Sequence, residues 1–217
     1  MKTKIALLAI LLGGQGIGWS QSVAAINVAT VSDLDQITPF HEGLAAVRKG
    51  DAWGFIDSQG ALVIDFRNDL FGNPSVNTKT SDIATMPYPR FHNGRCPIRV
   101  YTPEEPGIPL YGFIDTTGKT VIPPNFLNAS EFKDGIAVAI YFKKNFRGKN
   151  AFQLHIYYYA FTEVVLNPEG EMIWPLTERT QISMDRKRYK TPRLLGQILN
   201  RNLIGMGSEA YPNYLEI

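Results

Sequence analysis

The residue types that could do chemistry in this 217-residue chain are its three histidines, its carboxylates and one cysteine. His41 and His92 each follow a phenylalanine and lie two residues before a glycine. No two histidines are spaced at i, i+2 or i, i+4, the spacings at which one strand or helix presents two ligands to zinc. We expect the two positions to be held apart by the fold, and so we predict no metal site and assign both side chains to exposed strand ends.

Two pairs of carboxylates, Glu104–Glu105 and Glu169/Glu171, could supply the acid and base of a glycosidase. Both pairs lie in loop or turn sequence, where nothing apolar would shift their pKa, and we expect them to be solvated charges. Calcium binding is no better supported, because an Asp-x-x-Gly turn offers one carboxylate where calcium takes about six to eight oxygens.

The possible nucleophiles give no stronger evidence for catalysis. Cys96 directly precedes Pro97 in an apolar stretch, with no catalytic partner beside it, and is predicted to be a buried small hydrophobe. The sequence has no Gly-x-Ser-x-Gly motif, and its glycine cluster at 13–18 belongs to the leader described next. We therefore predict no catalytic residue and no cofactor, and expect a protein that is not an enzyme.

The first 20 residues are typical of a secretory signal peptide. Lys2 and Lys4 precede an apolar run, and Gly18 and Ser20 supply small residues for cleavage near Ser20–Gln21. Removing the leader takes two of the 22 basic residues and leaves 20 against 20 acidic ones, so bulk charge gives no argument for nucleic-acid binding. We expect a secreted or periplasmic protein with no membrane span in its mature chain.

The elements that must position any site are repeated. Phe-x-x-Gly begins three units, at Phe40, Phe91 and Phe132, and the leading phenylalanines are predicted to form a repeated core contact. Each unit continues into an Asx-x-x-Gly sequence that starts at Asp57, Asp115 or Asn167. An Asx side chain accepts hydrogen bonds from the backbone ahead of it, and the glycine adopts positive φ after a type I turn, so we predict three equivalent hairpin turns.

These residues resemble the WG-repeat family, named for a Trp-Gly pair that introduces Phe-Ile-Asp-x-x-Gly. Trp53–Gly54 and Tyr111–Gly112 match the pair, and its glycine is predicted to mark a bulge or a close backbone approach. The third unit keeps only the turn and its flanking strands. The resemblance covers about 40–175 and implies a β-repeat interaction scaffold tied to no known reaction.

The remaining segments complete the predicted organisation. Residues 21–39 form a lead-in, and the units occupy about 40–66, 91–124 and 132–175, with an irregular loop at 67–90. Thr191, Pro192 and the spacing of the later leucines and isoleucines predict an amphipathic helix over about 192–203 in the C-terminal extension 176–217. The predicted fold class is all-β, with tandem antiparallel β-hairpin repeats and this one helix.

Linkers at equivalent positions of a repeat tend to emerge on one face, which is often the binding face. Unit one has a tight hairpin there, unit two a proline-rich loop, and unit three a basic linker over 143–150. We predict that these linkers form one partly basic binding face, with the candidate residues Arg48, Lys49, Tyr101, Lys143, Lys144, Phe146 and Arg147.

Three functions remain open at this point. The first is an exported, non-catalytic scaffold that binds a protein or an anionic envelope polymer. The second is a glycan-binding accessory module, since exposed aromatics such as those in 157–159 could stack on sugars. The third is an enzyme with a loop-built site, which convergence of His41, His92 and a carboxylate in one cleft would favour.

Overall fold

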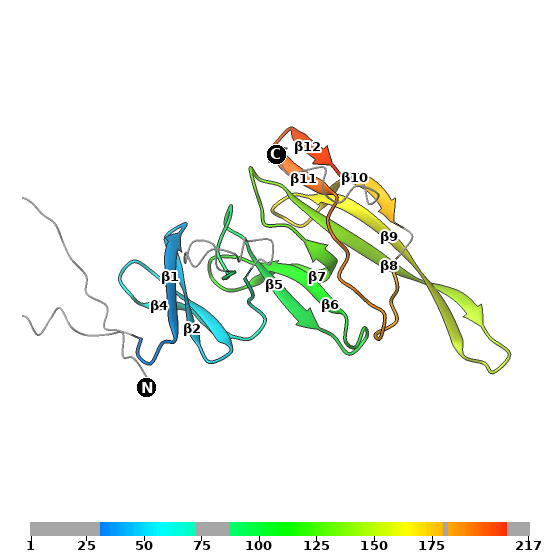
Figure 1. Cartoon of the computed structure of the whole chain (residues 1–217), viewed down its shortest axis with the longest axis horizontal. Helices are drawn as coiled ribbons and strands as arrows, with labels where there is room; N and C mark the ends of the chain where they lie inside the picture. The colour runs from blue at the N-terminus through cyan, green and yellow to red at the C-terminus, as the bar shows by residue number, and fades with distance from the viewer. Residues whose placement is uncertain (1–30, 73–86, 180–181, 208–217) are drawn as a thin grey trace, which may run out of the picture.

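The computed structural model describes residues 31–72, 87–179 and 182–207, and every regular element in these ranges is a β-strand (Figure 1). All strand pairs are antiparallel and form sheets of four, six and two strands. The described residues contain no helix that could cross a membrane. The strands are β1 (Gln36–His41), β2 (Leu44–Lys49), β3 (Ala52–Ile56), β4 (Leu62–Arg67), β5 (Cys96–Tyr101), β6 (Pro109–Ile114), β7 (Thr120–Ala129), β8 (Ala137–Lys149), β9 (His155–Leu166), β10 (Met172–Arg179), β11 (Gly196–Asn200) and β12 (Leu203–Met206).

Three units of the same kind follow one another along the chain. Unit one is β2–β3–β4, unit two is β5–β6–β7 and unit three is β8–β9–β10. In units one and two the last strand continues toward the next unit. Leu70, beyond β4, bridges Ile98 of β5, and the end of β7 pairs with β8. Residues 73–86 of the predicted irregular loop lie outside the described residues, as does the predicted signal peptide.

The predicted Asx turns are confirmed in all three units. The carboxylate of Asp57 accepts hydrogen bonds from the backbone N–H groups of Gln59 and Ala61, at 2.9 Å each. Asp115 and Asn167 accept the equivalent pairs, and the closing glycines have φ of 80°, 83° and 85°. Three different sequences therefore build one turn geometry.

The Phe-x-x-Gly sequences form a second set of turns, and these turns contact one another across the units. Both central residues of each turn have positive φ, as a type I′ hairpin requires. The carboxylate of Glu42 accepts hydrogen bonds from the backbone N–H groups of Asn93 and Gly94, and the side-chain oxygen of Asn93 accepts one from Gly135. We call this series the turn ladder.

Aromatic contacts between units form the core. The rings of Phe55 and Phe91 lie 4.8 Å apart between units one and two, and Phe113 and Phe132 lie 5.0 Å apart between units two and three. The predicted contact of the leading phenylalanines is thus confirmed for Phe91 and Phe132, which are 1% and 2% exposed. It is wrong for Phe40, which is 52% exposed because no described unit precedes it.

The glycines of the Trp-Gly and Tyr-Gly pairs lie where the last strand of the unit crosses closely, as predicted. A Cβ on Gly54 would lie 2.8 Å from the carbonyl oxygen of Ile64, and one on Gly112 would lie 2.5 Å from that of Ile122. The strand register shifts at both places. These positions require glycine because the obstructing atom is backbone, which cannot rotate away.

Both ends of the stack are covered, but not by a helix. Val31, Leu34 and Ile37 of the lead-in pack on Ala45, Val47 and Ile56 of unit one. At the other end, the two-stranded hairpin β11–β12 packs Ile198 against Ile136, Val138 and Val165 of unit three. Equivalent positions in unit one are covered by Phe91 of the next unit, so the hairpin takes the place of a fourth unit.

The predicted helix over 192–203 is therefore wrong. Residues 196–200 and 203–206 are strands, with a turn at Arg201–Asn202 closed by the side chain of Asn200. Gly196 packs so tightly on Leu176 that a Cβ would lie 2.8 Å from it. The strand pair packs Ile198 on the apolar face of unit three, and this tertiary contact overrides the local helical spacing.

Candidate functional site

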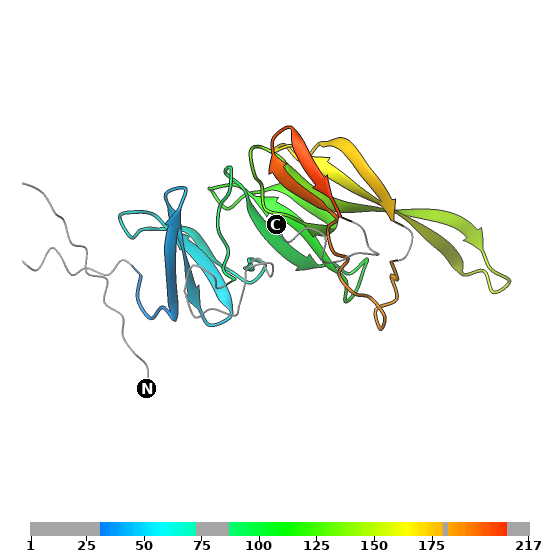
Figure 2. The same ribbon diagram turned by 45° about the horizontal axis from the view of Figure 1, so that its top comes forward.

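The most distinctive surface of the molecule is a long hairpin that departs from the repeat. The prediction of a basic linker over 143–150 is wrong, because Lys143 to Lys149 lie in β8 and pair with β9. The hairpin closes through Asn150, whose side chain accepts hydrogen bonds from Phe152 and Leu154 as in the other Asx turns. Figure 2 shows this hairpin extending well beyond the body of the molecule. We call residues 142–160 the arm.

An aromatic stripe follows one face of the arm. Phe142 and Phe146 of β8 alternate with Lys144, and Tyr157, Tyr159 and Phe161 lie opposite on β9. Neighbouring rings lie 5.8 to 6.3 Å apart at Phe146–Tyr157, Phe142–Tyr159 and Tyr159–Phe161. Exposure rises outward, from 6% at Phe161 to 58% at Phe146. The stripe therefore runs from the buried core to a solvent-exposed tip.

A buried carboxylate fixes the base of the stripe. Glu105 in the β5–β6 loop forms a 3.0 Å ion pair with the Nζ of Lys144 and accepts a hydrogen bond from the hydroxyl of Tyr159 at 3.2 Å. The hydrogen bond from Lys144 to Glu105 raises the pKa of that lysine, and burial raises the pKa of Tyr159. The expectation that Glu105 is a solvated charge is wrong, whereas Glu104, Glu169 and Glu171 are exposed.

Apart from Lys144, the basic residues of the arm have no acidic partner in the described ranges. Its basic residues are Lys143, Lys144, Arg147 and Lys149, and the sequence has no acidic residue from 143 to 162. Of these four, only Lys144 has an ion pair within the described ranges. The other face of the arm adds exposed apolar area through Tyr158 and Ile156. The arm thus combines exposed apolar side chains with uncompensated cations.

The predicted binding residues divide between two ends of the molecule. Lys143, Phe146 and Arg147 are exposed on the arm, and Tyr101 is exposed at the end of β5, in the unit whose loop supplies Glu105. Arg48 and Lys49 lie in the β2–β3 hairpin of unit one, at the opposite end of the stack (Figure 1). Arg48 is half-buried, with its guanidinium 5.9 Å from the centre of the Trp53 ring.

The histidines lie closer together than expected. The rings of His41 and His92 are 6.0 Å apart, because the turn ladder brings repeat-equivalent positions side by side. His41 Nε2 lies 2.9 Å from the hydroxyl of Tyr88, and His92 Nε2 lies 3.4 Å from a carboxylate oxygen of Glu131. Burial, then the nearby charges of Arg90 and His92, lower the pKa of His41.

This histidine cluster lies between units, and Glu131 is close to two of its residues. Arg90 forms a 3.2 Å ion pair with the same Glu131. In the ranges 31–72, 87–179 and 182–207, no three His, Cys, Asp or Glu residues are arranged to hold a metal. The contacts of His41 with His92 and Tyr88 join unit one to the start of unit two, and Glu131 reaches the cluster from just before unit three. We assign the cluster to these junctions.

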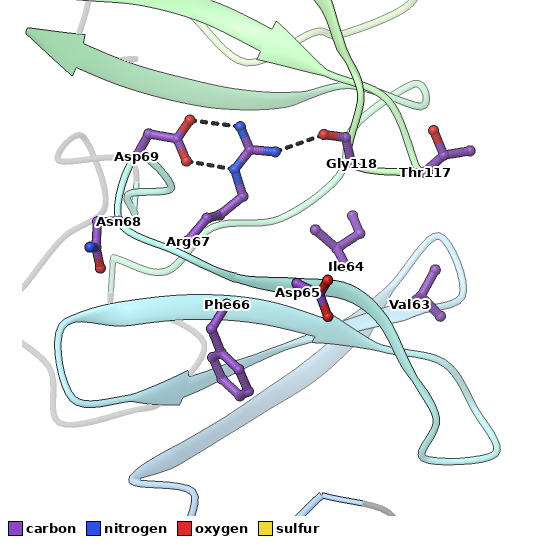
Figure 3. A pocket seen from close by; sticks show the side chains of 9 residues that line it. All are labelled: Val63, Ile64, Asp65, Phe66, Arg67, Asn68, Asp69, Thr117 and Gly118. Carbon is purple, nitrogen blue, oxygen red and sulfur yellow. Dashed lines mark hydrogen bonds and ion pairs between the residues drawn. The ribbon is translucent and has the colours of Figure 1, made fainter.

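A shallow groove of about 630 Å³ lies at the same junction (Figure 3). Arg67 lines the groove and donates two hydrogen bonds to the carboxylate of Asp69 and one, at 2.7 Å, to the carbonyl oxygen of Gly118. The guanidinium therefore links unit one to the turn of unit two. Cys96 is fully buried near this junction as predicted, and burial raises the pKa of its thiol.

Comparison with known proteins agrees with the repeat geometry. The family described as WG containing repeat matches residues 33–51, 53–71 and 111–141. The first two matches cover unit one with its lead-in strand, and the third runs from β6 into β8. No curated protein and no solved structure matches the chain.

Proposed function

Because this chain is a WG-repeat containing protein, we propose that it is an exported, non-catalytic scaffold that binds its partner with the arm. The stacked units hold the arm, and the arm makes the contact. The observation that carries this proposal is the exposed aromatic and cationic surface that begins on the buried core and projects from it. Contiguous exposed apolar area on a folded protein typically marks an interaction site.

The export of the protein rests on the leader sequence at 1–20. The absence of catalysis rests on the partners of the reactive groups. Glu105 is paired with Lys144, His92 lies beside Glu131, and Cys96 is buried with a raised pKa. An active nucleophile needs exposure and an activating neighbour, which the buried thiol lacks.

The test compares charge reversal on the arm with an equal charge change elsewhere. Lys143→Glu/Arg147→Glu is expected to retain several-fold less envelope-fraction material, protein and polysaccharide, than the unmodified protein. The matched control is Lys119→Glu/Arg201→Glu, which changes an exposed lysine of unit two and an exposed arginine in the β11–β12 turn. Equal retention by the arm variant and the unmodified protein would remove the arm from the proposal.

A glycan-binding accessory module is the second candidate. The half-exposed rings of Phe146 and Tyr157 share one face of the arm, an arrangement that can stack on sugar rings. A glycan array probed with the unmodified protein and with Phe146→Ala separates the candidates. Neutral glycans that bind the protein and are lost with the ring would favour the module.

A further inference from the structure

The outer edge of the arm is unpaired. Strand β8 pairs with β7 only as far as Tyr141, and β9 pairs with β10 only from Phe161 onward. Between these points and the tip, the two strands of the arm pair only with each other in the described structure. Their outer backbone N–H and C=O groups face away from any described strand, and such an edge is a template for another strand.

A two-stranded hairpin of this kind is marginally stable in water without a third strand or a packed face. The base of the arm is packed, through Phe161 and the ion pair between Lys144 and Glu105. The outer half has neither, and its apolar side chains are exposed on both faces. Adding a strand would satisfy the backbone edge and cover these side chains together.

The basic residues of the arm indicate which of its two edges accepts a strand and what charge that strand carries. All four basic residues of the arm lie on β8, and residues 155–160 of β9 carry no Lys or Arg. A second copy of this chain would bring its own Lys143, Arg147 and Lys149 against the same three cations, which have no ion pair in the described ranges, and this disfavours pairing between two arms. A strand rich in Asp or Glu is complementary to Lys143, Arg147 and Lys149.

We propose that an acidic segment of a partner protein adds to the β8 edge of the arm as a third strand. Backbone hydrogen bonds supply the pairing, the cations of β8 face the carboxylates, and the aromatic side chains contact alternate apolar residues of the segment. This inference rests on the proposed binding role of the arm, and it names the class of partner.

The first experiment is a binding screen with the full chain. The probe is an array of synthetic peptides of about ten residues that alternate Glu or Asp with Val, Ile, Thr or Tyr. A parallel array carries Lys in place of each acid. We expect only the acidic peptides to bind. Their affinity should be about tenfold lower for Lys143→Glu/Arg147→Glu and unchanged for the control Lys119→Glu/Arg201→Glu.

The second experiment separates strand addition from general attraction of anions. The tightest peptide is compared with a twin that is N-methylated at alternate residues, which keeps its charge but removes backbone donors, and with polygalacturonate. We expect the twin to bind at least about tenfold more weakly. Equal binding of the twin would overturn strand addition.

The two proposals fail in different ways. Binding of polygalacturonate but of no peptide would overturn the inference and leave the scaffold function intact, with an anionic polymer as partner. If no probe binds and the arm variant retains envelope material as well as the unmodified protein does, both proposals are overturned. Circular dichroism of the arm variants checks that the sheet content is unchanged.

Discussion

The stacked units and the arm are made of the same kind of hairpin but bury their side chains in opposite ways. In the stack, each unit covers the apolar layer of its neighbour, so that Phe55, Phe113 and Cys96 are almost fully buried. On the arm, the strands of unit three continue beyond their neighbours and the same alternation places aromatics in solvent. The difference shows that one repeat buries its aromatic side chains where units are in contact and exposes them where contact ends.

The sharpest test of this contrast replaces one phenylalanine in each region. Phe113→Ala removes a buried ring that packs on Phe132, and we expect the free energy of unfolding to fall by about 3–5 kcal/mol. Phe146→Ala on the arm should change it by less than about 0.5 kcal/mol. Urea denaturation measures both. Similar losses would show that the arm is packed in solution.

The next largest effect on stability is expected where the hairpin β11–β12, the C-terminal cap of the stack, packs on unit three. Glu163 is fully buried, pairs with Arg179 at 3.1 Å and accepts backbone hydrogen bonds from Leu195 and Gly196. Glu163→Gln leaves the arginine without its buried counter-charge and should cost about 3 kcal/mol. Hydrogen exchange should accelerate in β11–β12 more than in β2–β3. Uniform acceleration would contradict a separate cap.

A smaller effect should distinguish turn geometry from contact between units. Gly118 and Gly135 both have φ near +80°, but a Cβ on Gly118 would lie 3.0 Å from Ile64, whereas Gly135 has open space. Either alanine should cost about 1 kcal/mol from the backbone conformation. Thermal denaturation should show a further loss for Gly118→Ala alone. Equal shifts would mean that Ile64 moves aside freely.

The smallest effect is a pH dependence at the junction of units one and two. The pKa of His41 lies below its usual 6.5 in the folded protein, so the unfolded chain binds more protons as the pH falls through 6.5. Stability is therefore lost on acidification. The urea midpoint should be lower at about pH 5 than at about pH 7.5, and His41→Gln should reduce the difference. An unchanged pH dependence would assign it to other groups.

Much of the stack could be predicted from the sequence because its turns depend on local chemistry. Asp57, Asp115 and Asn167 identify their turns through interactions that reach four residues along the chain. The glycine of each Trp-Gly or Tyr-Gly pair likewise indicates a close approach. Contacts between side chains of neighbouring units are harder to predict from the sequence. Equivalent residues such as His41 and His92 lie in line because the turn ladder stacks the turns directly, and the chain spacing does not show this.

The errors occur where the chain departs from the repeat. The sequence of the arm resembles a linker because the alignment of the units places it between paired strands. In addition, its Asn150 turn has Gln153 at φ 62° where the other turns have glycine. The leucine and isoleucine spacing after Pro192 is compatible with a helix, and only contact with unit three selects β11–β12. Burial of Glu105 depends on Lys144 and Tyr159, which are distant in sequence.

The joints between the units differ in a way that bears on mechanical load. Units two and three share the continuous strand β7 and one six-stranded sheet, whereas β4 and β5 belong to different sheets joined by the bridge at Leu70–Ile98 and a hydrogen bond from Arg99 to Asp69. A pull between the N-terminal lead-in and the arm would put the same tension on both joints, and the joint between units one and two, which no continuous strand of the described residues crosses, would open first. Unit one would then separate while units two and three stayed together, because the six-stranded sheet that joins them would still be intact.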